Sequence, residues 1–119
     1  SARHYRIDEA GRITAVYDWD SLRVTREPVL VGGAAASFTV SGYLEDPPHW
    51  PDVEEARAFV RDYERARERR FDAGERRAVA AATLYAVAYK ARCEHALGRG
   101  GDARRLGSFE RAFHAEALA

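Results

Sequence analysis

Two aspartates stand where they could bind a metal ion. Residues 12–18 read RITAVYD, and Asp18 and Asp20 flank Trp19 at the carboxyl end of this apolar run. A strand end holds its side chains rigidly, and Mg²⁺ prefers oxygen ligands beside nucleotide phosphates, so the pair favours a magnesium site. The alternative is that Asp18 hydrogen-bonds the following loop while Asp20 is solvated, because strands often end in aspartate.

The element that positions these acids is predicted to be a β-hairpin. Residues 3–7 and 12–18 are rich in β-branched and aromatic residues, and residues 8–11, DEAG, supply turn chemistry between them. Because both faces of the second arm are largely apolar, we expect something to cover the hairpin on both sides.

The segment after the hairpin is predicted to be a buried helix followed by a loop. Residues 29–44 form an apolar run of helical length, despite the adjacent glycines Gly32 and Gly33. Residues 45–51, EDPPHWP, are rich in proline, which disfavours helix in the residue before it, so we expect a loop. This loop contains Trp50, whose ring we expect to pack into the core rather than to stack on a ligand.

Three more helices are predicted downstream. Two acid pairs with capping-box spacing introduce helices over about residues 53–70 and 76–97. The pairs are Asp52 with Glu55 and Asp72 with Glu75. The second of these helices is apolar around most of its circumference, so we expect it to be the central one. Glycines between 98 and 101 end it, and Asp102 can cap a last helix with apolar residues at 106, 109, 113 and 118.

These elements predict an α+β fold, in which an N-terminal β-hairpin precedes a mainly helical bundle. The chain of 119 residues has the length of a single domain, 1–119. Residues 1–22 form the hairpin with the metal-binding motif, and residues 29–119 form the helical part.

The charges and the cysteine content limit the classes of partner. Lys and Arg together number 19, as do Asp and Glu, so no net field recruits nucleic acid or an acidic membrane. The arginines between 65 and 70 alternate with acids and are expected to form a solvated helix face. The single cysteine, Cys93, cannot form an intramolecular disulfide, and no apolar stretch is long enough to span a bilayer. We therefore expect a cytoplasmic protein with neither nucleic acid nor a membrane as partner.

The segment VYDWDS, residues 16–21, resembles a motif of aminoglycoside phosphotransferases and choline-kinase-like proteins, which have a protein-kinase-like fold. In that family a strand ending in apolar-Asp-Trp-Asp/Glu follows a loop His-Gly-Asp-x-x-x-x-Asn across a hairpin with a glycine turn. His4 stands at the distance from Asp18 at which the family's Asn stands. The chain therefore resembles the C-terminal lobe portion of such a kinase.

The resemblance implies metal-binding roles for two residues, and the strand end offers a third candidate. Asp18 corresponds to the aspartate that binds the magnesium bridging the nucleotide phosphates, and His4 takes the place of the second metal-contacting residue. Imidazole offers nitrogen where Asn offers an amide oxygen, so this ligand differs from the family's. Asp20 is the third metal candidate. The family's catalytic aspartate would stand just before Ser1, so no catalytic residue is assigned.

The activity that the resemblance implies is transfer of a phosphoryl group from ATP, with Mg²⁺, to a hydroxyl of a small molecule. The printed sequence contains neither the catalytic base nor a Gly-rich phosphate loop, and no residue is assigned to nucleotide binding. Because phosphoryl transfer needs all these parts at once, we expect this chain by itself to be inactive. The sequence leaves open whether it binds Mg²⁺ or ATP.

Two alternatives stand beside this interpretation. A truncated kinase-like chain could serve as a non-catalytic binding or oligomerisation module, in which a second copy covers exposed apolar surface. The chain could also be an unrelated small α+β fold in which the Asp-Trp-Asp sequence is a coincidence.

Overall fold

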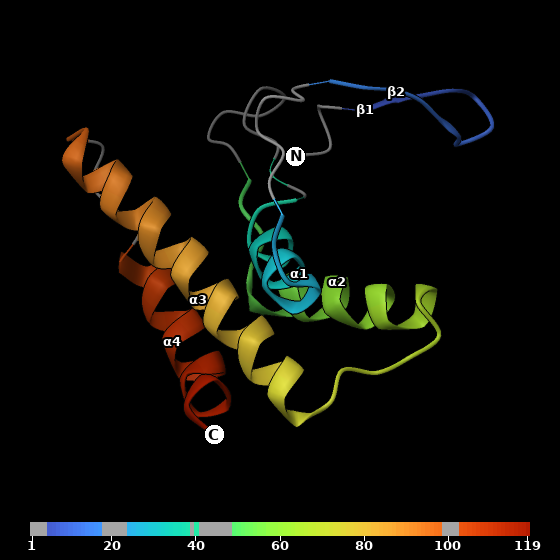
Figure 1. Ribbon diagram of the computed structural model, residues 1–119. Helices are drawn as coiled ribbons and strands as arrows, with labels where there is room; N and C mark the ends of the chain where they lie inside the picture. Colours follow the sequence, from blue (N-terminus) through green and yellow to red (C-terminus); the bar gives the residue numbers. More distant parts are fainter. Residues whose placement is uncertain (1–4, 18–23, 39, 41–48, 99–102) are drawn as a thin grey trace.

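A computed structural model describes residues 5–17, 24–38, 40, 49–98 and 103–119. Within these residues the chain forms a two-stranded antiparallel hairpin followed by four helices (Figure 1). The predicted α+β class, with the hairpin first and a mainly helical remainder, is confirmed. No helix in the described residues is long and apolar enough to cross a membrane.

The hairpin consists of β1 (Tyr5–Ile7) and β2 (Ile13–Val16), with Tyr5 opposite Val16. Its turn is fixed by Asp8, whose Oδ1 accepts hydrogen bonds from the backbone N–H groups of Ala10 (3.0 Å) and Arg12 (2.9 Å). Gly11 adopts a φ of +76°, a conformation that costs other residues energy. Hydrogen bonds from the backbone N–H of Arg12, from its side chain and from the backbone N–H of Ala10 lower the pKa of Asp8. The predicted hairpin and its turn are therefore confirmed.

The described residues of this chain leave most of the hairpin, whose two faces we expect to be covered, exposed to solvent. The hairpin projects away from the helices, at the upper right of Figure 1. As a result Ile7 is 59% exposed and Ile13 is 60% exposed. Tyr5 approaches the helical part, with its ring centroid 6.4 Å from that of Phe38. An isolated two-stranded hairpin is marginally stable in water, so burying these apolar side chains against another surface would stabilise it.

The first helix, α1 (Glu27–Ala35), is shorter than predicted and only half buried. It begins earlier than residue 29 because Pro28 suits the first turn of a helix, where its missing N–H costs nothing. It ends at Ala35, whereas the predicted helix extends to residue 44; residues 39 and 41–44 lie outside the described part. One face is buried, including Val31 and Gly32, while Leu30 is 60% exposed.

Both predicted capping boxes are present. In α2 (Val53–Ala66) the backbone N–H of Glu55 donates to Asp52 Oδ1 (2.9 Å), and the Asp52 N–H donates to Glu55 Oε2 (2.8 Å). The same pair of bonds joins Asp72 and Glu75 at the start of α3 (Ala73–Ala96). The predicted helix starts are therefore confirmed to within a few residues. α2 ends before residue 70, because Glu68 has a φ of +57° that no α-helix accommodates.

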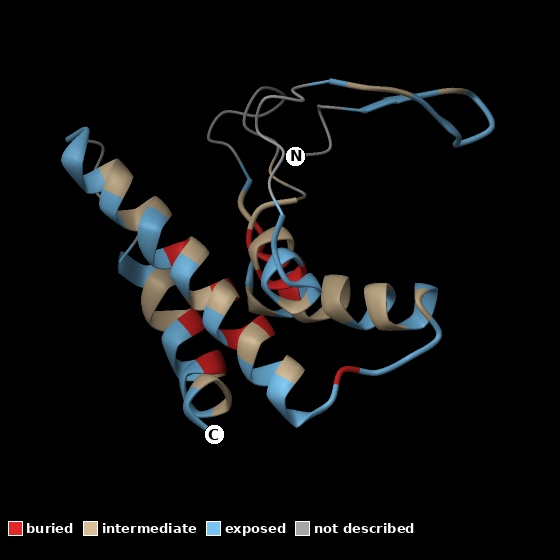
Figure 2. Cartoon of the chain, viewed as in Figure 1, coloured by how far each residue is buried: buried red, intermediate tan, exposed pale blue. Residues whose placement is uncertain are grey.

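α3 is the central helix, as predicted. It packs against α1 on one side and against α4 (Ala103–Leu118) on another (Figure 1). Figure 2 places many of the buried residues where these helices meet. The cores are two clusters of buried apolar residues: Ala35, Ala36, Ala56, Ala80, Val87, Phe109 and Phe113 in the larger, and Val31, Phe71 and Val79 in the smaller. The remaining side of α3 is open, since Tyr85 is 71% exposed and Tyr89 is 59% exposed.

α1 and α3 cross in direct backbone contact at Gly32. A Cβ at this position would overlap the carbonyl oxygen of Val79 and come within 2.8 Å of the Ala82 Cβ. Thr83, which is fully buried, donates its hydroxyl hydrogen bond toward the carbonyls of Val79 (2.8 Å) and Gly32 (3.2 Å). The crossing therefore requires glycine and is held by a hydroxyl that has no access to water.

α1 is also tied to α2 at its first turn. Tyr63 donates a hydrogen bond from its hydroxyl to Glu27 Oε1 (2.8 Å), and this bond raises the pKa of Tyr63. Arg67 Nη1 lies 3.2 Å from Glu27 Oε2, and the Arg67 guanidinium lies 4.3 Å from the centre of the Phe71 ring. The Arg67 side chain is only 13% exposed, so the predicted solvated face is wrong for this arginine.

Candidate functional site

The three residues predicted to bind metal, His4, Asp18 and Asp20, lie outside the described residues. The described chain reaches Tyr17, directly after β2 and directly before Asp18. Among the described residues no group of three His, Cys, Asp or Glu side chains could hold a metal ion. The metal site therefore stays a prediction.

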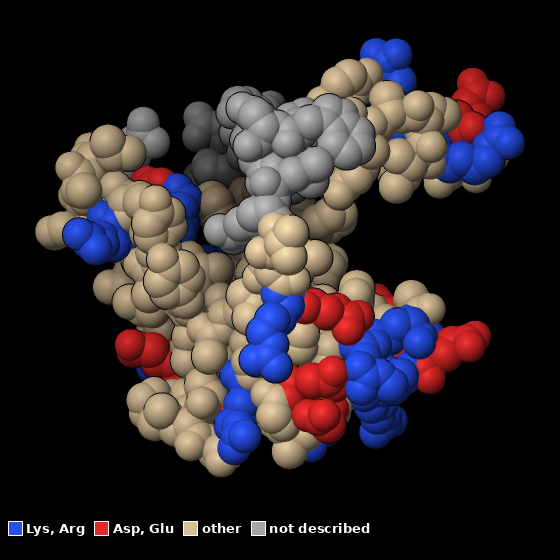
Figure 3. Space-filling model, viewed as in Figure 1, with Lys and Arg blue, Asp and Glu red and all other residues tan. Residues whose placement is uncertain are grey.

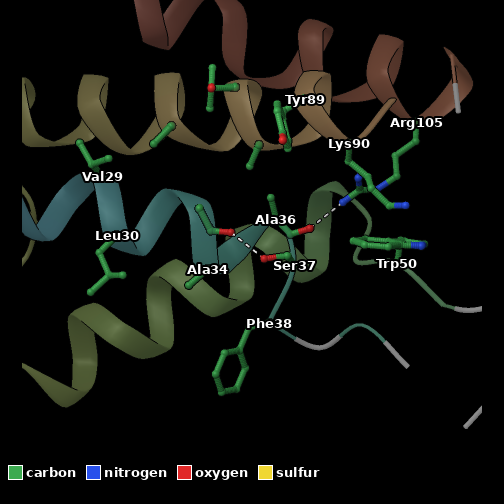
Figure 4. A pocket seen from close by; sticks show the side chains of 14 residues that line it. Val29, Leu30, Ala34, Ala36, Ser37, Phe38, Trp50, Tyr89, Lys90 and Arg105 are labelled. Atoms are coloured by element: carbon green, nitrogen blue, oxygen red, sulfur yellow. Dashed lines mark hydrogen bonds between the residues drawn. The ribbon is translucent and has the colours of Figure 1, made fainter. Parts of the chain in front are cut away.

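The described residues do contain a pocket of small-molecule size between α1 and α3, which we call the α1–α3 pocket (Figure 4). Its volume is about 770 Å³. Pockets of roughly 300–1,000 Å³ are typical of small-molecule sites. The described residues that line it are Val29, Leu30, Gly33, Ala34, Ala36, Ser37, Phe38, Trp50, Ala82, Tyr85, Ala86, Tyr89, Lys90 and Arg105.

Small side chains create this hollow. Gly33 and Ala34 of α1 line it together with Ala82 and Ala86 of α3, so at these four positions no long side chain fills the space. A Cβ at Gly33 would meet no described atom within 4 Å. The pocket therefore begins one residue beyond the tight crossing at Gly32, where a Cβ has no room at all.

Larger apolar side chains surround this hollow. Tyr85 and Tyr89 stand one turn apart on α3 with their rings stacked, 6.1 Å between centroids. Leu30 of α1 and Phe38 of the turn after it contribute further apolar surface (Figure 4). Ser37 is the polar group of this turn, and its hydroxyl donates to the Gly33 carbonyl (2.9 Å) rather than facing the pocket unpaired.

One end of the pocket is an aromatic ring beneath two cations. Lys90 Nζ lies 4.8 Å from the centre of the Trp50 ring, and the Arg105 guanidinium lies 5.6 Å from it. Lys90 also forms an ion pair with Glu94 one turn along α3. Trp50 is only partly buried, so it serves as a wall of the pocket rather than as the predicted plug of the core.

Arg105 joins this end of the pocket to three parts of the chain. Its Nε donates to the Pro51 carbonyl (3.0 Å), and its Nη2 donates to the Ala36 carbonyl at the end of α1 (2.8 Å). The guanidinium also lies over the ring of Phe109 in the core, 4.8 Å from its centre. Arg105 thereby fixes the loop that carries Trp50 against α1 and α4.

Charge is distributed unevenly between the pocket and the outer surface. No Asp or Glu appears among the described residues that line the α1–α3 pocket. By contrast, acidic and basic side chains interleave on the face shown in Figure 3, over the region of α2. Arg65 and Asp62 of α2 form an ion pair (2.8 Å), and Arg69 forms another with Glu75 of α3 (2.8 Å). The alternation expected from the sequence is thus present outside the pocket, whose described lining carries cations alone.

The pocket was not predicted from the sequence, although part of its lining has a recognisable pattern there. Tyr85 and Tyr89 are four residues apart on a helix, and Lys90 interrupts an otherwise apolar stretch. The helix crossing requires glycine at position 32, but no close contact with a described atom requires glycine at position 33. What no local pattern reveals is that Trp50 and Arg105 reach the same place from a loop and from another helix.

Comparison with known proteins adds no relative: no protein-family model matches the chain, and neither the curated proteins nor the solved structures contain a match to it.

Proposed function

We propose that this chain is the C-terminal portion of a Mg²⁺- and ATP-dependent small-molecule phosphotransferase similar to the aminoglycoside phosphotransferases. The observation that carries the proposal is the VYDWDS motif, whose Asp18 follows the second strand of a hairpin with a glycine turn. The family resemblance implies that arrangement of strand, turn and acid. A reducing cytoplasm, which supplies ATP and Mg²⁺ and keeps Cys93 as a free thiol, is the proposed compartment.

In the proposed enzyme Asp18 would be the principal ligand of the magnesium ion. His4 and Asp20 complete the protein's share of the ligands, with imidazole nitrogen in place of an amide oxygen at His4. Bound by these residues, Mg²⁺ would neutralise negative charge on the phosphates of ATP. These 119 residues hold no counterpart of the family's catalytic base or phosphate loop, so the chain alone is expected to transfer no phosphate.

The metal assignment is tested with Mn²⁺, a paramagnetic probe that substitutes for Mg²⁺. We expect Mn²⁺ to broaden the amide NMR signals of residues 16–20 selectively, and Asp18→Asn to abolish this effect. Asp8→Asn is the matched control, because Asp8 belongs to the same hairpin but is occupied by the turn. Broadening that survives Asp18→Asn, or that follows Asp8 instead, would contradict the assignment.

The family assignment is tested by the coding sequence upstream of Ser1. An in-frame segment encoding His-Gly-Asp at the spacing of the family's loop, preceded by a nucleotide lobe, is the expected result. A stop codon directly before Ser1 would overturn the proposal that the chain is part of a kinase.

A second candidate function, a non-catalytic module that oligomerises, is favoured by the uncovered hairpin. Ile7 and Ile13 are more than half exposed. The sheet has two strands in the described residues, so each of these strands has one edge that pairs with no other described strand. If a second copy covers this surface, light scattering will find a dimer or larger species, and the double substitution Ile7→Thr with Ile13→Thr will return it to a monomer. A monomeric wild-type chain at high micromolar concentration would exclude this candidate.

A further inference from the structure

We infer that the α1–α3 pocket binds a small molecule with a flat apolar body and an anionic group, and that the anionic group lies beside Lys90. This inference goes beyond the proposed phosphotransferase activity and does not depend on it. It concerns a site that the motif around Asp18 does not include, and it is tested without nucleotide or metal.

The apolar body of the ligand is inferred from the walls of the pocket. Tyr85, Tyr89 and Leu30 line the pocket and are 71%, 59% and 60% exposed. Large apolar side chains gathered around one hollow mark a binding surface more often than singly scattered ones do. Aromatic rings present flat faces, so a flat ring system buries the most surface against them.

The space for this body is created at a residue whose packing does not require glycine. A glycine inside a helix costs roughly 0.5–1 kcal/mol relative to alanine. Gly32 repays that cost through the α3 crossing, but a Cβ at Gly33 would touch no described atom. Gly33 lines the pocket, and its missing side chain leaves room for a ligand ring to approach the backbone of α1.

The anionic group is inferred from the other end of the pocket. An ammonium group has three donor hydrogens, and the partners described for Lys90 are the Glu94 carboxylate and the face of the Trp50 ring. These two contacts hold Nζ in place while leaving donor capacity toward the pocket that Lys90 lines. The Arg105 guanidinium stands at the same end.

The charge of the lining disfavours a polycation as the ligand. The described lining residues include two cations and no carboxylate, and Glu94 already pairs with Lys90. A ligand with several ammonium groups would find repulsion at the Trp50 end and no counter-charge elsewhere in the described lining. The anionic group is assigned to Lys90 because Arg105 already donates to the carbonyls of Pro51 and Ala36.

The test uses anilinonaphthalenesulfonate, an aromatic anion, and N-phenylnaphthylamine, which lacks the sulfonate and is neutral. In a Trp19→Phe background Trp50 is the only tryptophan, so energy transfer from its emission reports a dye seated in the pocket. We expect saturable binding of one sulfonate dye per chain. Lys90→Met should weaken that binding roughly tenfold and leave the neutral dye within about twofold.

Filling the pocket should remove both dyes. Gly33→Leu places a side chain in the hollow, and Gly107→Leu is the control, because Gly107 lies in α4 and does not line the pocket. Tyr89→Ala is the second variant should Gly33→Leu lose cooperative thermal unfolding, since Tyr89 is exposed and its removal leaves the core intact. Spermine, a polycation, should give no binding heat in calorimetry.

Three results would overturn the inference. They are an absence of dye binding to the folded chain, binding unchanged by both Gly33→Leu and Tyr89→Ala, and binding of the neutral dye as tight as that of the sulfonate. Any of these can occur while the manganese experiment on Asp18 still succeeds. The pocket inference and the phosphotransferase proposal therefore fail separately.

Discussion

The contact between α1 and α3 is closed at Gly32 and open at Gly33. At the closed part the two backbones touch, and the buried Thr83 hydroxyl bonds the Gly32 carbonyl. At the open part the same two helices line a pocket of about 770 Å³. The two adjacent glycines thus have different effects: Gly32 permits the helices to approach closely, and Gly33 leaves a space that no described side chain fills.

The sharpest way to break this comparison is to add one methyl group at each glycine. Gly32→Ala should lower the free energy of unfolding by about 2–3 kcal/mol, because its Cβ collides with backbone atoms of α3 that cannot move aside singly. Urea unfolding monitored by circular dichroism measures the change. A loss under about 0.5 kcal/mol would mean that the helices do not touch at this residue.

The buried hydroxyl at the crossing should have the next largest effect on stability. Thr83→Val keeps the volume of the side chain but removes the donor to the Gly32 carbonyl, so we expect a loss of about 1–2 kcal/mol. Thr83→Ser retains the hydroxyl and should recover part of that loss. If the valine variant is as stable as the wild type, the buried hydroxyl contributes nothing to the closed region.

The open region should respond in the opposite direction. Gly33→Ala replaces a helical glycine by the best helix former and meets no described atom, so we expect a gain of about 0.5–1 kcal/mol in unfolding free energy. The same denaturation assay measures it. Destabilisation by more than about 1 kcal/mol would show that the space beside Gly33 is occupied in the folded chain.

The smallest effect concerns the start of α3, the helix that both regions share. A hydrogen bond from the Arg69 guanidinium, together with the Asp72 backbone N–H, lowers the pKa of Glu75 from its ordinary value of 4.5. The ionised carboxylate is therefore the form favoured by folding. The stability that this charge contributes is complete above pH 4.5. It is lost as the pH falls through the lowered pKa that Glu75 has in the folded state.

Glu75→Gln isolates that charge, because glutamine retains the capping-box bond. The variant should be slightly less stable than the wild type at pH 7, and the difference should shrink on acidification. Thermal unfolding of both proteins at pH 7 and at acidic pH measures the difference in stability. Glu54→Gln, in the first turn of α2, is the control. A difference independent of pH would contradict the role of the Arg69 contact.

Local chemistry is sufficient to predict the elements of this fold. The capping boxes at Asp52 and Asp72 act within three residues of each helix start, and the Asp8 turn acts within four. Such signals depend on neighbours in the sequence alone. Together with the apolar pattern of residues 76–97, they predict the hairpin, the starts of α2 and α3, and the central position of α3.

What the sequence does not predict depends on contacts between distant segments. The charge pattern predicts a solvated face for Arg67, yet this side chain meets Glu27, which lies far from it in the sequence. The sequence favours a core position for Trp50, but Lys90 and Arg105 approach its ring at the edge of a pocket.

Two further predictions, the burial of the first helix and the metal site, depend on contacts with distant parts of the chain. The apolar run beginning at residue 29 predicts a buried helix, whereas α1 buries one face and leaves Leu30 exposed. The metal residues His4, Asp18 and Asp20 lie outside the described residues, so their prediction awaits the manganese experiment.

The most direct test of the central claim, that the Gly33 face of α1 is open while its neighbour is closed, is cysteine labelling. In a Cys93→Ser background, a Gly33→Cys chain should react with N-ethylmaleimide at a rate close to that of the unfolded chain. Ala35→Cys, at a position only 2% exposed, should be strongly protected. Equal protection at both positions in the native state would contradict the open pocket.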